Sequence, residues 1–181
     1  TVNVTTANGA VLKDTELSHA DTIAIGAGTT SIDAETAEED SFFAAKTTIK
    51  DGAKLEVANY IDSDISGLTV EGSGLVEVTT KSDATASLDE TKLEDATKVT
   101  LGGAATAAAE KLDAIGTNAG NLHLNDKTLA VTGYTNQNLS GLQGTGTVNV
   151  TTADGAVLRD TELTQADAIV IGDGITSIDA A

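Results

Sequence analysis

The sequence predicts a mainly β protein, an elongated and repetitive β-solenoid-like array with short helical insertions. Three observations favour this fold: a long segment occurs twice, short alternating strands recur at a regular spacing, and helix signals are sparse. Residues 1–34 and 147–180 differ at only 8 of 34 positions. Self-similarity of this kind is typical of repeat proteins, in which each unit buries its apolar face against its neighbours.

A shorter period divides the 146 residues that separate these two segments. Residues 51–68 match residues 126–142, with Tyr60 aligned to Tyr134 and a Ser-Gly-Leu triplet closing both segments. The pattern L-x-x-A-x-x-(I/V)-x-(I/L)-G begins three times, at Leu17, Leu93 and Leu163. We therefore divide the chain into repeat units 1–73 and 74–146, followed by the start of a third unit at 147–181.

Short strands recur inside each unit. Their alternation of apolar and polar residues gives each strand one apolar face. Successive strands begin 21 to 24 residues apart, which is the length that one coil of a solenoid consumes, so about three coils account for one unit. The strands are headed by Val2, Ile23 and Thr47 in the first unit and by Val76, Val99 and Leu122 in the second.

Helices are predicted only between these strands. Residues 89–98 and 106–116 have helical composition, and Gly116 is suited to end the second helix. Residues 33–46 predict a third helix with acidic residues in its first turn, where the helix dipole favours them. Tandem small β-sandwich domains and a mixed strand–helix horseshoe are the alternatives. The absence of Trp and Pro and the coil-length spacing disfavour the sandwiches.

Composition excludes several classes of function. Ten basic residues against 28 acidic ones give a net charge of −18, which disfavours nucleic acid and anionic membranes as partners. No apolar run reaches the roughly 20 residues needed to cross a bilayer, so membrane insertion is not expected. There is no Cys, hence no disulfide and no thiolate metal site. The chain starts at Thr1 inside a repeat and has no Met, so we expect it to be a segment of a longer or processed protein.

Residues 17–37 resemble the 23-residue class of leucine-rich-type repeats in bacterial surface proteins. The matching positions are Ile23, Ile25, Thr30, Ser31, Ile32 and Ala34. The Cys-free, acidic repeats rich in Thr, Ala, Gly and Asp resemble giant adhesins and surface-layer proteins of bacteria. This resemblance implies an extracellular or cell-surface module that acts in reach, assembly or adhesion.

The sequence contains no convincing catalytic group. His19 is replaced by Gln165 in the later copy, and His123 alternates with Leu122 and Leu124. We predict a solvent-facing strand position for both histidines. The cluster of Glu38, Glu39 and Asp40 is typical of a solvated helix face. We therefore expect no enzymatic activity.

Calcium is the only cofactor that the sequence suggests. Asp62 and Asp64 lie beside a glycine, and Asp173 lies between two glycines, where carboxylates in turns suit this cation. The matched residues, however, are Asn136, Asn138 and Ala27, and turn chemistry alone explains such Asp and Asn residues.

These observations predict a non-catalytic structural repeat module of an extracellular bacterial protein, forming a stalk, a surface layer or a filament. Its expected partners are copies of itself or neighbouring repeats, stacked head-to-tail. The alternative is an adhesin module that binds a ligand or Ca²⁺ through the variable loops 34–46 and 102–121. Tyr60 and Tyr134 are predicted to anchor a junction between coils or units.

Overall fold

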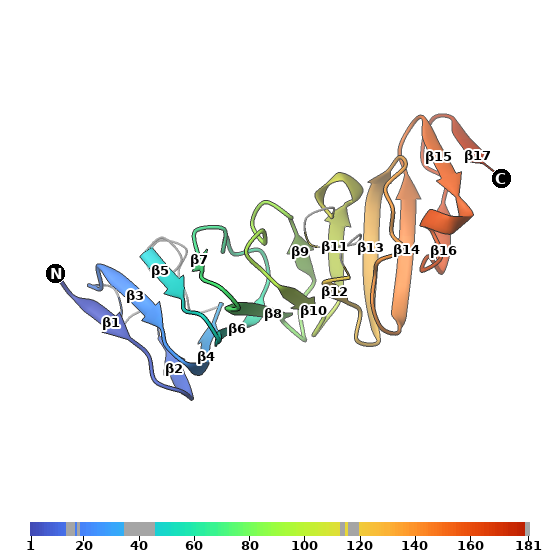
Figure 1. Ribbon diagram of the computed structural model, residues 1–181. Coiled ribbons are helices and arrows are strands. Elements are labelled where there is room, and N and C mark those ends of the chain that lie inside the picture. The colour runs from blue at the N-terminus through green and yellow to red at the C-terminus, as the bar shows by residue number, and fades with distance from the viewer. Residues whose placement is uncertain (14–16, 18, 35–45, 113–114, 116–119, 180–181) are drawn as a thin grey trace.

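The computed structural model describes residues 1–13, 17, 19–34, 46–112, 115 and 120–179. They form an elongated solenoid that winds from one end of the molecule to the other (Figure 1). All pairs among the named strands are parallel, and paired residues lie 18 to 25 positions apart in the sequence. The predicted β-solenoid is confirmed, because tandem sandwiches would consist of antiparallel sheets.

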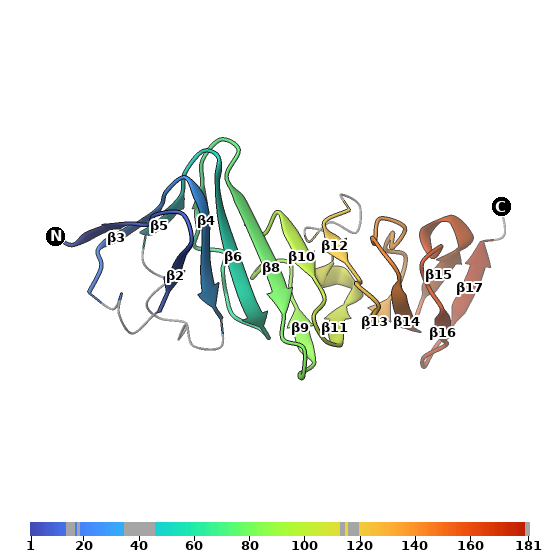
Figure 2. The same ribbon diagram turned by 90° about the horizontal axis from the view of Figure 1, so that it is seen from below.

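The strands form four parallel sheets. The first contains β1 (Asn3–Thr5), β3 (Thr22–Ile25), β5 (Lys46–Ile49) and β7 (Thr69–Val70). The second contains β2 (Ala10–Leu12), β4 (Gly28–Asp33), β6 (Ala53–Tyr60), β8 (Leu75–Thr80), β10 (Lys98–Thr100) and β12 (Leu122–His123), of which Figure 2 shows β4 to β10 side by side. The third contains β9 (Ala86–Leu88), β11 (Ala105–Ala108), β13 (Lys127–Tyr134), β14 (Gly146–Thr152) and β16 (Ala168–Val170), and the fourth pairs β15 (Ala156–Arg159) with β17 (Thr176–Asp179).

Equivalent strands of successive units lie in different sheets. The VNVTT and VEVTT segments form β1, β8 and β14, which belong to the first, second and third sheets. The chain passes β1, β3, β5 and β7 in one sheet before β8 joins the next sheet. One unit therefore spans three full turns of the solenoid plus the step from one sheet to the next. The sequence predicted about three coils per unit.

The core is a set of apolar ladders inside the solenoid. One ladder follows the register of the second sheet and consists of Leu12, Ile32, Val57, Val78, Val99 and Leu122. Each of these side chains is buried. Full burial of such a side chain contributes about 1.5–3 kcal/mol, and a lone coil could not provide it. The alternating pattern read from the sequence thus points its apolar face inward.

The helix predicted at 89–98 is wrong, and so is the beginning of the helix predicted at 106–116. Residues 89–97 form turns. Of the helix predicted at 106–116, residues 106–108 belong to β11, and the short 3-10 helix η1 (Ala109–Lys111) follows. Residues 113–114 and 116 lie outside the described part of the chain. Ala105 and Ala107 point into the core and Ala108 is exposed, so this Ala-rich segment alternates like a strand between β9 and β13. The predicted helix at 33–46 lies mostly outside the described residues.

A second 3-10 helix in the described part of the chain is η3 (Asp160–Glu162). None of the helices that the structure describes has the length and the apolar character needed to cross a membrane.

A bulge brings the recurring tyrosines into the core. The register of β6 shifts between Val57 and Tyr60, and that of β13 shifts in the same way before Tyr134. The extra residue takes a positive φ in both units, 54° at Asn59 and 68° at Gly133. Both tyrosines are fully buried, as expected for an anchor between coils.

Candidate functional sites

The motif that recurs three times forms a structural corner. A buried Thr that ends each VTT segment accepts a hydrogen bond on Oγ1 from the backbone N–H of the motif's glycine. These N···O distances are 3.1 Å for Thr6–Gly26, 2.9 Å for Thr80–Gly102 and 3.0 Å for Thr152–Gly172. A Cβ on any of these glycines would lie 2.1–2.5 Å from the backbone oxygen of the same threonine. Only glycine therefore fits this corner.

The Leu and Ala positions of the motif close a turn, and the residue after the Ala makes a second contact between coils. Each Ala donates its N–H to the carbonyl of the motif's Leu, at 2.8–2.9 Å. The next residue accepts an N–H bond from the coil below: Asp21 from Val2 at 2.6 Å, Thr97 from Val76 at 2.9 Å and Asp167 from Val148 at 2.7 Å. The recurring polar residues of the motif are thus used in holding one coil to the next.

Asp64, one of the calcium candidates, lies in a turn after β6. Its Oδ1 accepts hydrogen bonds from the N–H of Ser66 at 3.0 Å and from the Ser66 hydroxyl at 2.7 Å. These bonds, the hydroxyl first, hold the pKa of the Asp64 carboxyl below its usual value. Asp62 is exposed, and its carbonyl accepts a bond from the Lys92 ammonium at 2.8 Å, so a side-chain cation already lies beside it.

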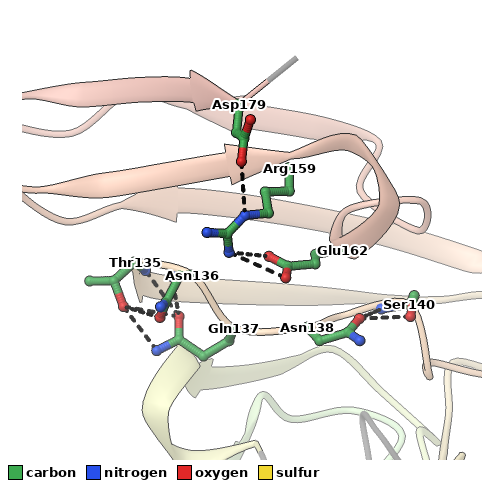
Figure 3. Close-up of polar contacts among 8 residues, drawn as sticks. All are labelled: Thr135, Asn136, Gln137, Asn138, Ser140, Arg159, Glu162 and Asp179. Atoms are coloured by element: carbon green, nitrogen blue, oxygen red, sulfur yellow. Dashed lines mark hydrogen bonds and ion pairs between the residues drawn. The ribbon is translucent and has the colours of Figure 1, made fainter. Parts of the chain in front are cut away.

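The same turn occurs in the second unit without the carboxylate. Asn138 Oδ1 accepts from the N–H of Ser140 at 2.9 Å and from its hydroxyl at 2.6 Å (Figure 3). Asn136, the counterpart of Asp62, is exposed. Because the neutral amide makes the same two bonds as Asp64, the turn geometry itself accounts for an oxygen-bearing side chain at this position.

The basic and acidic residues beside this turn are exchanged between units. Arg159 and Glu162 form an ion pair at 3.3 Å near the second turn, and Arg159 also contacts Asp179 at 3.4 Å (Figure 3). The aligned residues near the first turn are Asp89 and Lys92, in which the charges are reversed. The charges beside the turn thus differ between the two units, whereas the turn itself is the same.

The third calcium candidate, Asp173, lies far along the solenoid from the first two, Asp62 and Asp64. Asp173 is exposed and lies in the corner between β16 and β17, several turns beyond Asp62 and Asp64. In the described part of the chain, no three His, Asp or Glu side chains converge on a position that could hold a metal ion. Asp154, on the neighbouring coil, differs in that its Oδ1 accepts the N–H of Ile175 at 2.8 Å.

The two histidines occupy different environments. His19 is exposed in a turn, so the prediction of a strand position for it is wrong. His123 lies on β12, half-buried, where burial and then the nearby Lys98 charge lower its pKa. Glu38, Glu39 and Asp40 lie outside the described residues, as do nearly all of the variable loop 34–46 and residues 113–114 and 116–119 of the variable loop 102–121.

One polar recess was not anticipated from the sequence. It has a volume of about 280 Å³ and is lined by Lys98, Thr100, His123, the pair Asn125–Asp126 and the pair Gly144–Thr145. The sequence feature that could have indicated it is a shortened link in the second unit. Four residues join Leu142 to Thr147, whereas six residues join the matched Leu68 and Leu75 in the first unit. No protein-family model, curated protein or solved structure is significantly similar to this chain.

Proposed function

We propose that the chain is a non-catalytic structural repeat module of an extracellular bacterial protein, which builds a stalk, surface layer or filament by stacking of its units. One observation carries the stacking proposal. Side chains that are buried in the first unit are exposed in the copy that forms the last coil. Ile23, Ile25 and Ile32 are 0–1 % exposed, whereas their counterparts Ile169, Ile171 and Ile178 are 41, 55 and 76 % exposed.

The first unit shows what covers these positions. There β5 pairs with β3 and β6 pairs with β4, so a further coil lies over the three isoleucines. At the last coil the outer edges of β16 and β17 have no paired strand among the described residues. The other end of the solenoid also exposes Val2 and Val11, at 51 and 69 %. A neighbouring repeat, or the first coil of a second copy, would bury these apolar side chains and pair the open strand edges in the same direction.

The pattern of differences between copies supports a scaffold rather than a reaction centre. The corner residues Thr80 and Gly102 and their equivalents are kept in all three units. His19 and Asp62, which could carry chemistry, are replaced by Gln165 and Asn136. The bacterial cell surface is proposed from the style of the repeats, the absence of Cys and the acidity of the chain.

Sedimentation velocity over a series of protein concentrations tests the stacking. We expect the wild-type chain to form elongated assemblies that grow with concentration, and Ile171→Asp to reduce this growth because it places a charge on the end surface. Val170→Asp is the matched control, since it introduces the same charge one residue away, on the outer side of β16. A chain that stays monomeric at every concentration, or equal behaviour of the two variants, would contradict end-to-end stacking.

A further inference from the structure

The polar recess lies on the outer side of the second sheet, where that sheet ends at β12. Lys98 and Thr100 flank Val99, which is fully buried, so both point away from the core. His123 is the neighbour of Thr100 in the register of β10 and β12. The opposite wall consists of Asn125–Asp126 and Gly144–Thr145, from the corners on either side of the contracted link.

The recess is a feature of the second unit only. In the first unit β7 pairs with β5, and the Glu71 carboxylate that follows it contacts the Lys50 ammonium at 3.0 Å. In the second unit the link is two residues shorter, and a single bridge between His123 and Gln143 replaces the paired strand. The shortened link contains no acidic residue, so the carboxylate that Glu71 supplies in the first unit has no counterpart here.

Two basic side chains face this gap. Glu77 is the register neighbour of Lys98, but its carboxylate lies 3.4 Å from the Lys54 ammonium instead. Lys98 therefore has no ion pair with any residue that the structure describes. The pKa of His123 is lowered first by burial and then by Lys98, so the two groups are close enough to repel each other when both are charged.

We propose that this recess binds a small oxyanion, a sulfate or phosphate group, between the Lys98 ammonium and the protonated His123 imidazole. The Thr100 hydroxyl supplies a further donor. Charge-assisted hydrogen bonds to an oxyanion are about twice as strong as neutral ones, and the anion relieves the repulsion between the two basic groups. A ligand of this class fits the small, polar volume of the recess.

The charges around His123 set the pH dependence of binding. Lys98 faces it from β10 and Asp126 from the corner after β12, while the link from Gln143 to Gly146 has no ionisable side chain. The Asp126 carboxylate accepts a hydrogen bond from the Thr145 hydroxyl. With His123 protonated the recess carries a net positive charge, and with His123 neutral it carries none. The oxyanion therefore binds more tightly as the pH falls through the pKa of His123.

Nuclear magnetic resonance titration of the two imidazoles tests the proposal, with the exposed His19 as an internal reference. The pKa of each histidine is measured between about pH 5 and 8 in sodium sulfate and in sodium chloride of equal ionic strength. We expect sulfate to raise the pKa of His123 by about one unit, a tenfold preference of the anion for the protonated form, and to leave that of His19 unchanged. Equal behaviour of the two histidines, or no difference between the two salts, would overturn the proposal.

Lys98→Thr separates binding from folding, because Thr22 occupies the matched position in the first unit. This variant should raise the pKa of His123 in chloride, since the Lys98 charge is gone, and should abolish the additional rise in sulfate. A full sulfate effect without Lys98 would contradict the assignment. A titration with a sulfated monosaccharide distinguishes the source of the group: a larger shift than with the free ion indicates a sugar-borne sulfate, and an equal shift indicates the free ion. None of these outcomes depends on end-to-end stacking.

Discussion

At the scale of single residues, the same turn is built with an acid in one unit and an amide in the next. Asp64 and Asn138 accept the same pair of bonds from Ser66 and Ser140. The Asp64 carboxylate makes them as a charged acceptor, and the Ser66 bonds lower its pKa. The carboxylate thus contributes stability only while it is ionised.

Asp64→Asn should therefore reduce the acid sensitivity of the fold. A carboxyl whose folded pKa is lowered contributes stability above its unfolded pKa, near 3.9, and loses this contribution as the pH falls through the folded value. We expect the variant to be slightly less stable than wild type at pH 7 and to lose less stability between about pH 4 and pH 2. Urea unfolding at a series of pH values measures this difference.

Asp173→Asn is the control, because Asp173 is exposed and accepts no hydrogen bond within the described part of the chain. Its profile of unfolding free energy against pH should follow that of wild type. Identical pH profiles for wild type and Asp64→Asn would contradict the role assigned to the Ser66 bonds.

At the scale of elements, the recurring corner explains which positions the repeats keep. Strands β10 and β11 are joined through Gly102, whose N–H bonds to Thr80 on the coil below. The glycine is needed for close approach, since a Cβ would lie 2.1 Å from the Thr80 carbonyl oxygen. The close spacing of neighbouring coils thus explains why glycine recurs at this position in each unit.

Gly102→Ala should destabilise the chain by about 3 kcal/mol, the upper part of the usual range for overpacking, because the atom it meets is backbone and cannot rotate away. Gly52→Ala is the matched control: Gly52 has a φ of 70° but nothing within 4 Å of an added Cβ. Its cost should be about 1 kcal/mol, from backbone strain alone. The midpoint of urea unfolding compares the two, and an equal loss in both variants would contradict the steric explanation.

At the scale of the whole molecule, equivalent strands shift to the next sheet with each unit, and this shift decides which residues lie on each face of the solenoid. Corresponding strands of the three units lie in three sheets, so the surfaces of successive units point in three directions around the solenoid. The long, thin shape also spreads a net charge of −18 along one axis (Figure 1). Like-charge repulsion therefore acts between neighbouring coils as well as between molecules.

Added salt should stabilise the fold. Raising the ionic strength from about 10 to 150 mM shortens the screening length from about 30 to 8 Å, which weakens repulsion between carboxylates on different coils. We expect the urea midpoint to rise over this range of sodium chloride. A midpoint that does not change with salt would show that the carboxylates are already compensated by ion pairs such as Lys54–Glu77.

The sequence by itself predicted the solenoid, the strands headed by Val76 and Val99 and an anchoring role for Tyr60 and Tyr134, because alternation and self-similarity encode which residues face the core. It misled at residues 106–108, since Ala suits both a helix and a narrow strand, and pairing with β9 and β13 decided between them. Only the tertiary structure placed Lys98 beside His123 and placed the equivalent strands of successive units in different sheets. Both results depend on how many residues each turn consumes and on which strands then lie in register, and these are properties of contacts between distant segments rather than of any local pattern.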